Sequence, residues 1–168
     1  MERVRAVREI RPVPKKLPNT TIEFRQDAYL DRGYIANQEQ KMEIYRRLAA
    51  IEDEKTLTDL IDEVIDRFGT PSQPAEKLFR ISEIRVKARH LGIGSIIDEG
   101  DSLLVTWADE SFMHGWDPMK LPKTWLPYLK FLPGSPAKLR IPKALIKGTM
   151  TDWMADFMDE LKRETGKQ

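Results

Sequence analysis

The sequence of 168 residues contains no cysteine and only two histidines, His90 and His114. Without cysteine the chain forms no disulfide and no thiolate metal site, so nothing in it requires an oxidising compartment. The two histidines are far apart, and neither has a second histidine or a carboxylate at a spacing that holds a metal. We therefore expect no metal site.

Long apolar runs are also absent. No run approaches the roughly 18 residues of a membrane span, and the N-terminus lacks the apolar segment of a signal peptide. We therefore expect a cytoplasmic location and no membrane partner.

Motifs of catalysis are missing as well. The chain has no glycine-rich loop followed by lysine and serine or threonine, which would bind phosphates, and no Gly-x-Ser-x-Gly nucleophile motif. Acid-base catalysis requires carboxylates whose pKa values are shifted by burial, but the clustered carboxylates of residues 59–66 project from an exposed helix face. We predict that the chain is not an enzyme and binds no cofactor.

Charge is plentiful but uneven. Charged residues make up 33% of the chain and hydrophobic residues 40%, with a formal net charge of +1. Residues 1–16 are basic, and prolines at 12, 14 and 18 break any helix within residues 1–21. We interpret residues 1–21 as a basic linker and residues 22–168 as one domain.

The hydrophobic periodicity predicts a mixed α/β (α+β) fold with helices packed on a small sheet. Asn37, Ser72 and Thr149 are predicted helix N-caps. The last helix carries a methionine-rich and aromatic stripe that favours the core over a partner surface. The predicted elements are a strand within 20–30, helices at 38–51, 57–68 and 73–91, a hairpin of 93–97 and 103–107, a helix at 123–132, a strand at 138–141 and a last helix from residue 150.

The helix at 57–68 has an apolar stripe at i, i+3, i+4 spacing, made of Leu57, Leu60, Ile61, Val64, Ile65 and Phe68. Its other face is an acidic ridge that contains Asp59, Asp62, Glu63, Asp66 and one arginine, Arg67. Such a ridge is either solvated, with an internal Glu63–Arg67 pair, or a docking surface. Taken alone, these residues favour a solvated ridge over a docking surface.

Several segments resemble the C-terminal domain of the bacterial transcription-repair coupling factor. The similarity begins near Ile22 and covers about 145 residues. It rests on Asp27-Ala28-Tyr29-Leu30 with Tyr34-Ile35, and on residues 40–49, 63–69 and 85–93.

The resemblance implies a role in nucleotide excision repair. The family parent is similar to a superfamily-2 helicase, an ATP- and magnesium-dependent translocase on double-stranded DNA that removes stalled RNA polymerase and recruits UvrA. None of its motor motifs occurs in this chain. The resemblance implies instead a regulatory module that packs on the UvrB-like module of the parent and masks its UvrA-binding surface.

The family residues at that contact match Glu63, Asp66 and Arg67, so the resemblance favours the docking surface. We predict that these residues bind the UvrB-like module. Two alternatives remain: DNA binding through the basic residues 3–16, and an enzyme with unrecognised chemistry.

Overall fold

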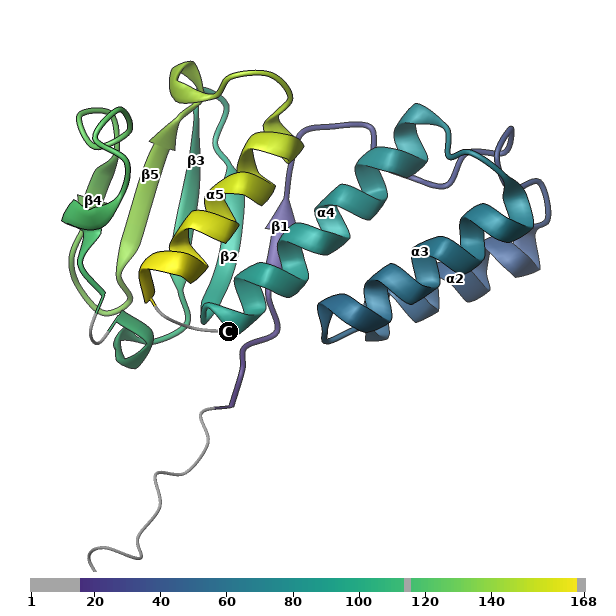
Figure 1. The fold of residues 1–168 in the computed structure, drawn as a ribbon, viewed down its shortest axis with the longest axis horizontal. Helices are drawn as coiled ribbons and strands as arrows, with labels where there is room; N and C mark the ends of the chain where they lie inside the picture. Colours follow the sequence, from purple (N-terminus) through teal and green to yellow (C-terminus); the bar gives the residue numbers. More distant parts are fainter. Residues whose placement is uncertain (1–15, 114–115, 166–168) are drawn as a thin grey trace, which may run out of the picture.

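The computed structural model describes residues 16–113 and 116–165. Within them, five strands form one mixed sheet in the order β1-β2-β3-β5-β4, and four α-helices lie to one side of it or beyond its edge (Figure 1). The predicted mixed α+β class of a single domain is confirmed. The strands are β1 (Thr21–Glu23), β2 (Ile93–Asp98), β3 (Ser102–Trp107), β4 (Lys130–Leu132) and β5 (Lys138–Pro142). The α-helices are α2 (Gln38–Ala50), α3 (Glu54–Phe68), α4 (Gln73–His90) and α5 (Met150–Thr165), and the 3-10 helices are η1 (Glu110–Met113), η2 (Pro118–Lys120) and η3 (Lys143–Leu145).

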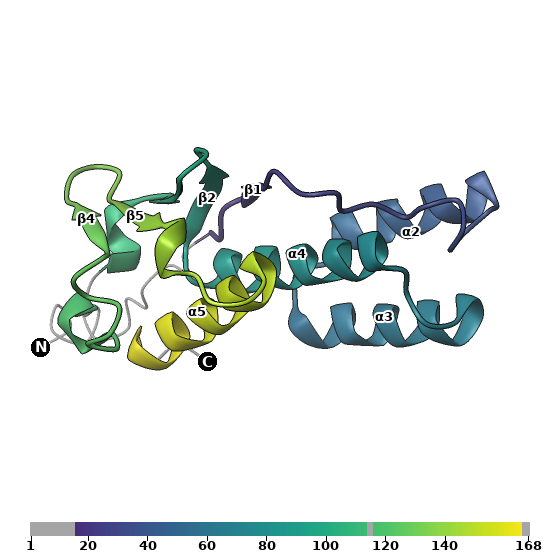
Figure 2. The same ribbon diagram turned by 90° about the horizontal axis from the view of Figure 1, so that it is seen from above.

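The sheet has one covered face and one open face. β1 pairs with β2 in parallel, and the other neighbouring strands are antiparallel. Because side chains alternate along a strand, Ile96, Val105 and Leu139 share one face, and all three are buried. Helices α4 and α5 cover this face, and no α-helix of the described residues lies on the other (Figures 1 and 2).

Helix α4 belongs to two hydrophobic clusters. Its Ile84 and Ala88 pack with the sheet and α5, whereas its Phe79 and Val86 pack with residues of α2 and α3. Two of the four helices therefore pack on α4 rather than on the sheet, which gives the molecule its elongated form (Figure 2).

The predicted caps are confirmed. Asn37, Ser72 and Thr149 each accept a hydrogen bond from the backbone N–H three residues further on. Helices α3 and α4 end before Gly69 and Gly92, which have φ angles of +85° and +76°. Glycine suits this left-handed conformation, which other residues adopt at a cost.

The last helix confirms the core interpretation of its apolar stripe. All six stripe residues are buried in the cluster formed with the sheet: Met150, Trp153, Met154, Phe157, Met158 and Leu161. The stripe is therefore not available as a partner surface.

The helix predicted at residues 123–132 is wrong. Residues 123–128 form turns, and Lys130–Leu132 is strand β4, paired with β5. Pro127 has no N–H for a helical hydrogen bond and restricts the residue before it. Trp125 packs instead on Trp153 and Phe157, with ring centroids 5.2 and 5.5 Å away.

Two other boundaries differ from the prediction. The first strand is limited to Thr21–Glu23, because only these residues pair with β2. On α3 the stripe is narrower than predicted: Leu57, Leu60 and Val64 are buried, but Ile65 is 38% exposed. Ile65 lines a hollow between α3 and α4 instead of the core.

Most of the predicted linker, residues 1–15, lies outside the described residues, and its boundary stays a prediction. Leu17 packs against the sheet cluster, and the Thr20 hydroxyl donates to the carbonyl of Ile93 at 2.7 Å. No helix in the described part of the chain is long and apolar enough to cross a membrane.

Candidate functional site

Four charged side chains from α2 and α3 form one surface cluster, which consists of Glu43, Arg47, Glu63 and Arg67. Arg47 donates from Nη1 and Nη2 to the two carboxylate oxygens of Glu63, at 2.5 and 2.9 Å. Arg67, one helical turn beyond Glu63, donates to its Oε2 at 3.2 Å. Glu43 lies 3.6 Å from Arg47 and 3.9 Å from Arg67. Glu63 therefore links α3 to α2 through Arg47 and binds Arg67 on its own helix.

This arrangement changes the acidity of Glu63. The hydrogen bonds from Arg47 are the largest cause that lowers the pKa of Glu63, from 4.5 to about 2, with Arg67 adding to the effect. Glu63 in turn raises the pKa of Arg47. The cluster is solvent-accessible, with Arg47 and Glu63 side chains 40% and 41% exposed, so screening limits its contribution to stability.

Asp66 stands apart from this cluster. Its side chain is exposed and forms no ion pair or hydrogen bond with any residue that the structure describes. Of the three predicted partner-binding residues, the structure thus brings Glu63 and Arg67 together and leaves Asp66 unpaired. The Arg67 guanidinium also lies over the Phe68 ring, 4.9 Å from its centroid, so its orientation is fixed from two sides.

Sequence reasoning assigned no role to Arg47. Its partner lies sixteen residues away on the next helix, and helical periodicity relates only residues within one helix. The available signal was a basic residue near the end of one helix that precedes a helix with an acidic face.

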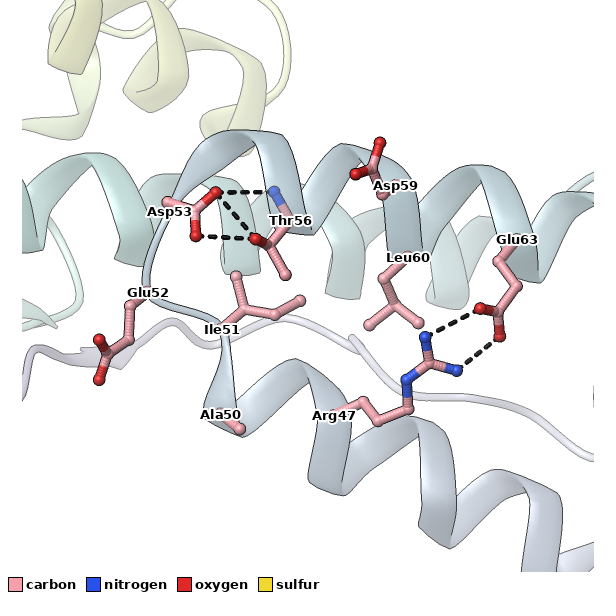
Figure 3. Close-up of a pocket in the computed structure, with 9 residues that line it drawn as sticks. All are labelled: Arg47, Ala50, Ile51, Glu52, Asp53, Thr56, Asp59, Leu60 and Glu63. Atoms are coloured by element: carbon pink, nitrogen blue, oxygen red, sulfur yellow. Dashed lines mark hydrogen bonds and ion pairs between the residues drawn. The ribbon is translucent and has the colours of Figure 1, made fainter.

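A hollow of about 440 Å³ adjoins the Arg47–Glu63 pair, between the C-terminal end of α2 and the first half of α3 (Figure 3). Its apolar lining is Ala50, Ile51 and Leu60. Its carboxylates are those of Glu52, Asp53, Asp59 and Glu63. Asp53 is engaged as the N-cap of α3 and Asp59 pairs with Lys55 at 3.0 Å. The excess of carboxylates favours a cationic group over an anion here.

A family model described as the TRCF domain matches residues 24–115, more than half of the chain. The chain belongs to the TRCF domain family. Arg47 and all three predicted partner-binding residues lie within the matched residues of this TRCF domain.

Several curated relatives are named transcription-repair-coupling factor. The chain is 37% identical over 105 residues to the transcription-repair-coupling factor of Staphylococcus haemolyticus, which covers 62% of this chain and 9% of that protein. It is 38% identical to the factors of Staphylococcus epidermidis over 104 residues (62% and 9%) and of Staphylococcus aureus over 99 residues (59% and 8%). The chain thus spans less than a tenth of the length of these relatives.

A solved structure shows the same fold. The crystal structure of the C-terminal domain of transcription-repair coupling factor superposes with a TM-score of 0.75 at 19% sequence identity. It covers 92% of this chain and 99% of that chain. The similarity of fold therefore extends beyond residue 115, through the C-terminal strands and α5.

Within the described part of the TRCF domain, no group of three or more histidine, aspartate or glutamate side chains is placed to hold a metal ion. His114 lies outside the described residues. The expectation of no metal and no cofactor therefore stays a prediction.

Proposed function

We propose that this TRCF domain is a non-catalytic regulatory module of a transcription-repair coupling factor. It docks on the UvrB-like module of the same parent protein and masks the surface that binds UvrA. The parent acts on RNA polymerase and double-stranded DNA with ATP and magnesium, and this chain supplies control rather than chemistry. The observation that carries the proposal is the unpaired, exposed Asp66 beside the oriented Arg67 on α3.

The three residues have different roles in this proposal. Asp66 accepts charge-assisted hydrogen bonds from a basic residue of the partner, and Arg67 donates to an acidic one. Glu63 already accepts three hydrogen bonds from the two arginines. A carboxylate offers about four acceptor positions, so Glu63 mainly orients Arg67 and has little capacity left for the partner.

A weak contact is sufficient for this function. Two modules of one polypeptide meet at an effective concentration on the order of millimolar. A coupling of roughly 1–3 kcal/mol between docking and UvrA binding then changes UvrA affinity about fivefold to a hundredfold. A tighter contact would not open when the parent engages polymerase or DNA.

Titration calorimetry of this chain against the UvrB-like module of its parent tests the proposal. The variant is Asp66→Lys, and the matched control is Asp156→Lys on α5, which changes the same residue type at another exposed position without an ion pair among the described residues. Charge reversal in a close pair costs on the order of 2–5 kcal/mol. We expect no measurable binding for Asp66→Lys and native affinity for Asp156→Lys.

Two outcomes would contradict the proposal. Equal binding by the native chain and Asp66→Lys would show that the contact does not involve Asp66 on α3. No binding by the native chain at high concentration would show that the domain does not dock on this module, and would favour the alternative, DNA binding through residues 3–16. A DNA titration at several salt concentrations would then test that alternative.

A further inference from the structure

The segment of residues 116–147 carries an excess of positive charge. It contains a single acidic residue, Asp117, and seven basic ones: Lys120, Lys123, Lys130, Lys138, Arg140, Lys143 and Lys147. Among the described residues only two of these seven are ion-paired, Arg140 with Glu99 at 3.5 Å and Lys143 with Asp98 at 2.7 Å. The segment lies beyond the matched residues 24–115, so its charge is a separate feature from the α2–α3 cluster.

The sheet register brings part of this charge onto the open face. Ile97 of β2 pairs with Leu104 of β3, Leu104 with Arg140 of β5, and Arg140 with Lys130 of β4. Because Leu139 and Ile141 point into the core, the alternate residue Arg140 and its row point to the open face. The row is therefore apolar in its middle and basic toward β4.

A second row runs parallel to the first. Thr106 of β3 pairs with Lys138 of β5, and Lys138 pairs with Leu132 of β4. Lys130 and Lys138 thus lie on the same face, on adjacent strands, and neither has an ion-pair partner among the described residues.

An exposed aromatic ring adjoins these cations. Tyr128 is 59% exposed and lines a hollow of about 580 Å³ together with Lys130 and Arg140. Glu99 and Asp101 of the β2–β3 turn line the same hollow. An anion is therefore best accommodated on the β4 side, at Lys130 and Lys138.

We propose that the open face of the sheet binds single-stranded nucleic acid. Lys130 and Lys138 contact successive phosphates, Tyr128 stacks on a base, and the apolar surface of Ile97 and Leu104 lies under the neighbouring sugars and bases. Open sheets with basic edges and exposed rings hold single strands in this way, because an unpaired base presents its flat face for stacking. In a duplex the bases are stacked inside, so they cannot stack on the Tyr128 ring or contact the apolar surface of Ile97 and Leu104. This surface is independent of the docking surface on α3.

Fluorescence anisotropy of a labelled oligothymidine of about 12 nucleotides, titrated with the full chain, tests the proposal. The test variants are the double variant Lys130→Glu/Lys138→Glu and the single variant Tyr128→Ala. The matched control is Lys41→Glu/Lys77→Glu, which reverses two lysines of α2 and α4 that have no ion pair among the described residues. All four proteins retain residues 1–15, so any binding by that basic segment is common to them.

We expect the Lys130→Glu/Lys138→Glu variant to bind at least about tenfold more weakly, with the salt dependence of log K reduced by about 1 to 2. Tyr128→Ala should weaken binding about fivefold or more, and the control should match the native chain. Thermal unfolding of each variant checks that these surface changes leave the fold intact.

Three results would overturn the proposal. One is an equal loss of affinity in the Lys41→Glu/Lys77→Glu control, which would reflect net charge alone. Another is duplex DNA bound as tightly as the single strand with no effect of Tyr128→Ala. The third is displacement of the oligonucleotide by polyglutamate at equal charge concentration, which would show a face that accepts any polyanion.

Discussion

Arg47 of α2 donates two hydrogen bonds to the carboxylate of Glu63 on α3, at 2.5 and 2.9 Å. Glu63 also binds Arg67, so Arg47 indirectly orients a residue of the proposed docking surface. A partner that brings its own cation to Glu63 must displace Arg47 or share the carboxylate with it. Arg47 therefore sets how available Glu63 is to a partner.

Replacing Arg47 with methionine should raise the pKa of Glu63 toward its ordinary value. In the native chain the pKa of Glu63 is about 2, and without Arg47 it should rise toward 4.5. A carboxylate with a lowered pKa stabilises the fold above its unfolded pKa, and this stabilisation is lost as the pH falls from about 4.5 to about 2. The native chain should therefore lose its stability advantage over Arg47→Met across that interval.

NMR titration of the Glu63 side-chain carboxyl carbon, with urea unfolding at each pH, measures both effects. The control is Arg46→Met, because within residues 16–113 and 116–165 the Arg46 side chain donates only to the carbonyl of Met42, at 3.4 Å. An unchanged Glu63 pKa in Arg47→Met would show that the bidentate pair does not persist in solution.

Arg85 of α4 should stabilise the end of α2. Its Nη2 donates to the carbonyls of Leu48 and Ile51, at 2.9 and 3.1 Å. The Leu48 carbonyl also accepts from the backbone N–H of Ile51 at 3.3 Å, whereas Ile51 lies past the helix end. Arg85→Met removes one hydrogen bond from each carbonyl and should lower the free energy of unfolding by about 1–3 kcal/mol. Urea denaturation measures the loss, and Lys77→Met on the same helix is the control. Similar losses in both variants would mean that removing a positive charge from α4, and not losing the two hydrogen bonds of Arg85, lowers the stability.

Gly92 should tolerate no side chain. Its φ is +76°, and a Cβ there would overlap the Phe112 ring, whereas Gly69 has a φ of +85° with nothing within 4 Å of the added atom. Gly69→Ala should cost about 1 kcal/mol from backbone strain alone, and Gly92→Ala about 2–4 kcal/mol from strain and overlap together. Chemical denaturation of the two variants compares them directly. Equal costs would show that the Phe112 ring moves aside freely.

Features that depend on residues close together in the chain could be predicted from the sequence. The caps at Asn37, Ser72 and Thr149, the hairpin of β2 and β3, and the buried stripe of α5 all depend on residues close together in the chain. The TRCF resemblance was likewise carried by short segments. These parts of the prediction agree with the structure for that reason.

Features that depend on a distant partner could not be predicted. Strand β4 has three residues, too few for a periodic signal, and it forms because β5 offers a free edge. A strand within residues 20–30 was predicted, but its limits, Thr21–Glu23, are set by pairing with β2. Ile65 fits the apolar stripe by spacing, but its exposure is set by where α4 packs. The Arg47–Glu63 pair depends on how α2 meets α3, so the predicted site lacked the residue that fixes its geometry.

Lys143 should keep Asp98 ionised inside the fold. The Asp98 side chain is 1% exposed and receives hydrogen bonds from Lys143 Nζ at 2.7 Å and from the backbone N–H of Gly100 and Arg25, at 2.9 and 3.2 Å. Burial, the largest influence, raises the pKa of Asp98, but these donors together outweigh it and hold the pKa below 3.8. The ionised carboxylate therefore stabilises the fold above pH 3.8 and stops doing so as the pH falls through its lowered pKa.

Lys143→Met keeps most of the apolar stem and removes the charge, so it leaves a buried carboxylate without its cation. The free energy of unfolding should fall by about 1–3 kcal/mol at neutral pH, and the deficit should shrink as the pH falls below 3.8, where protonation removes the charge from Asp98. Urea denaturation across this pH range measures the deficit, with Lys147→Met as the control because Lys147 is exposed and has no ion pair among the described residues. A deficit that is independent of pH would mean that Lys143 acts through packing, since only the loss of charge pairing depends on the protonation of Asp98.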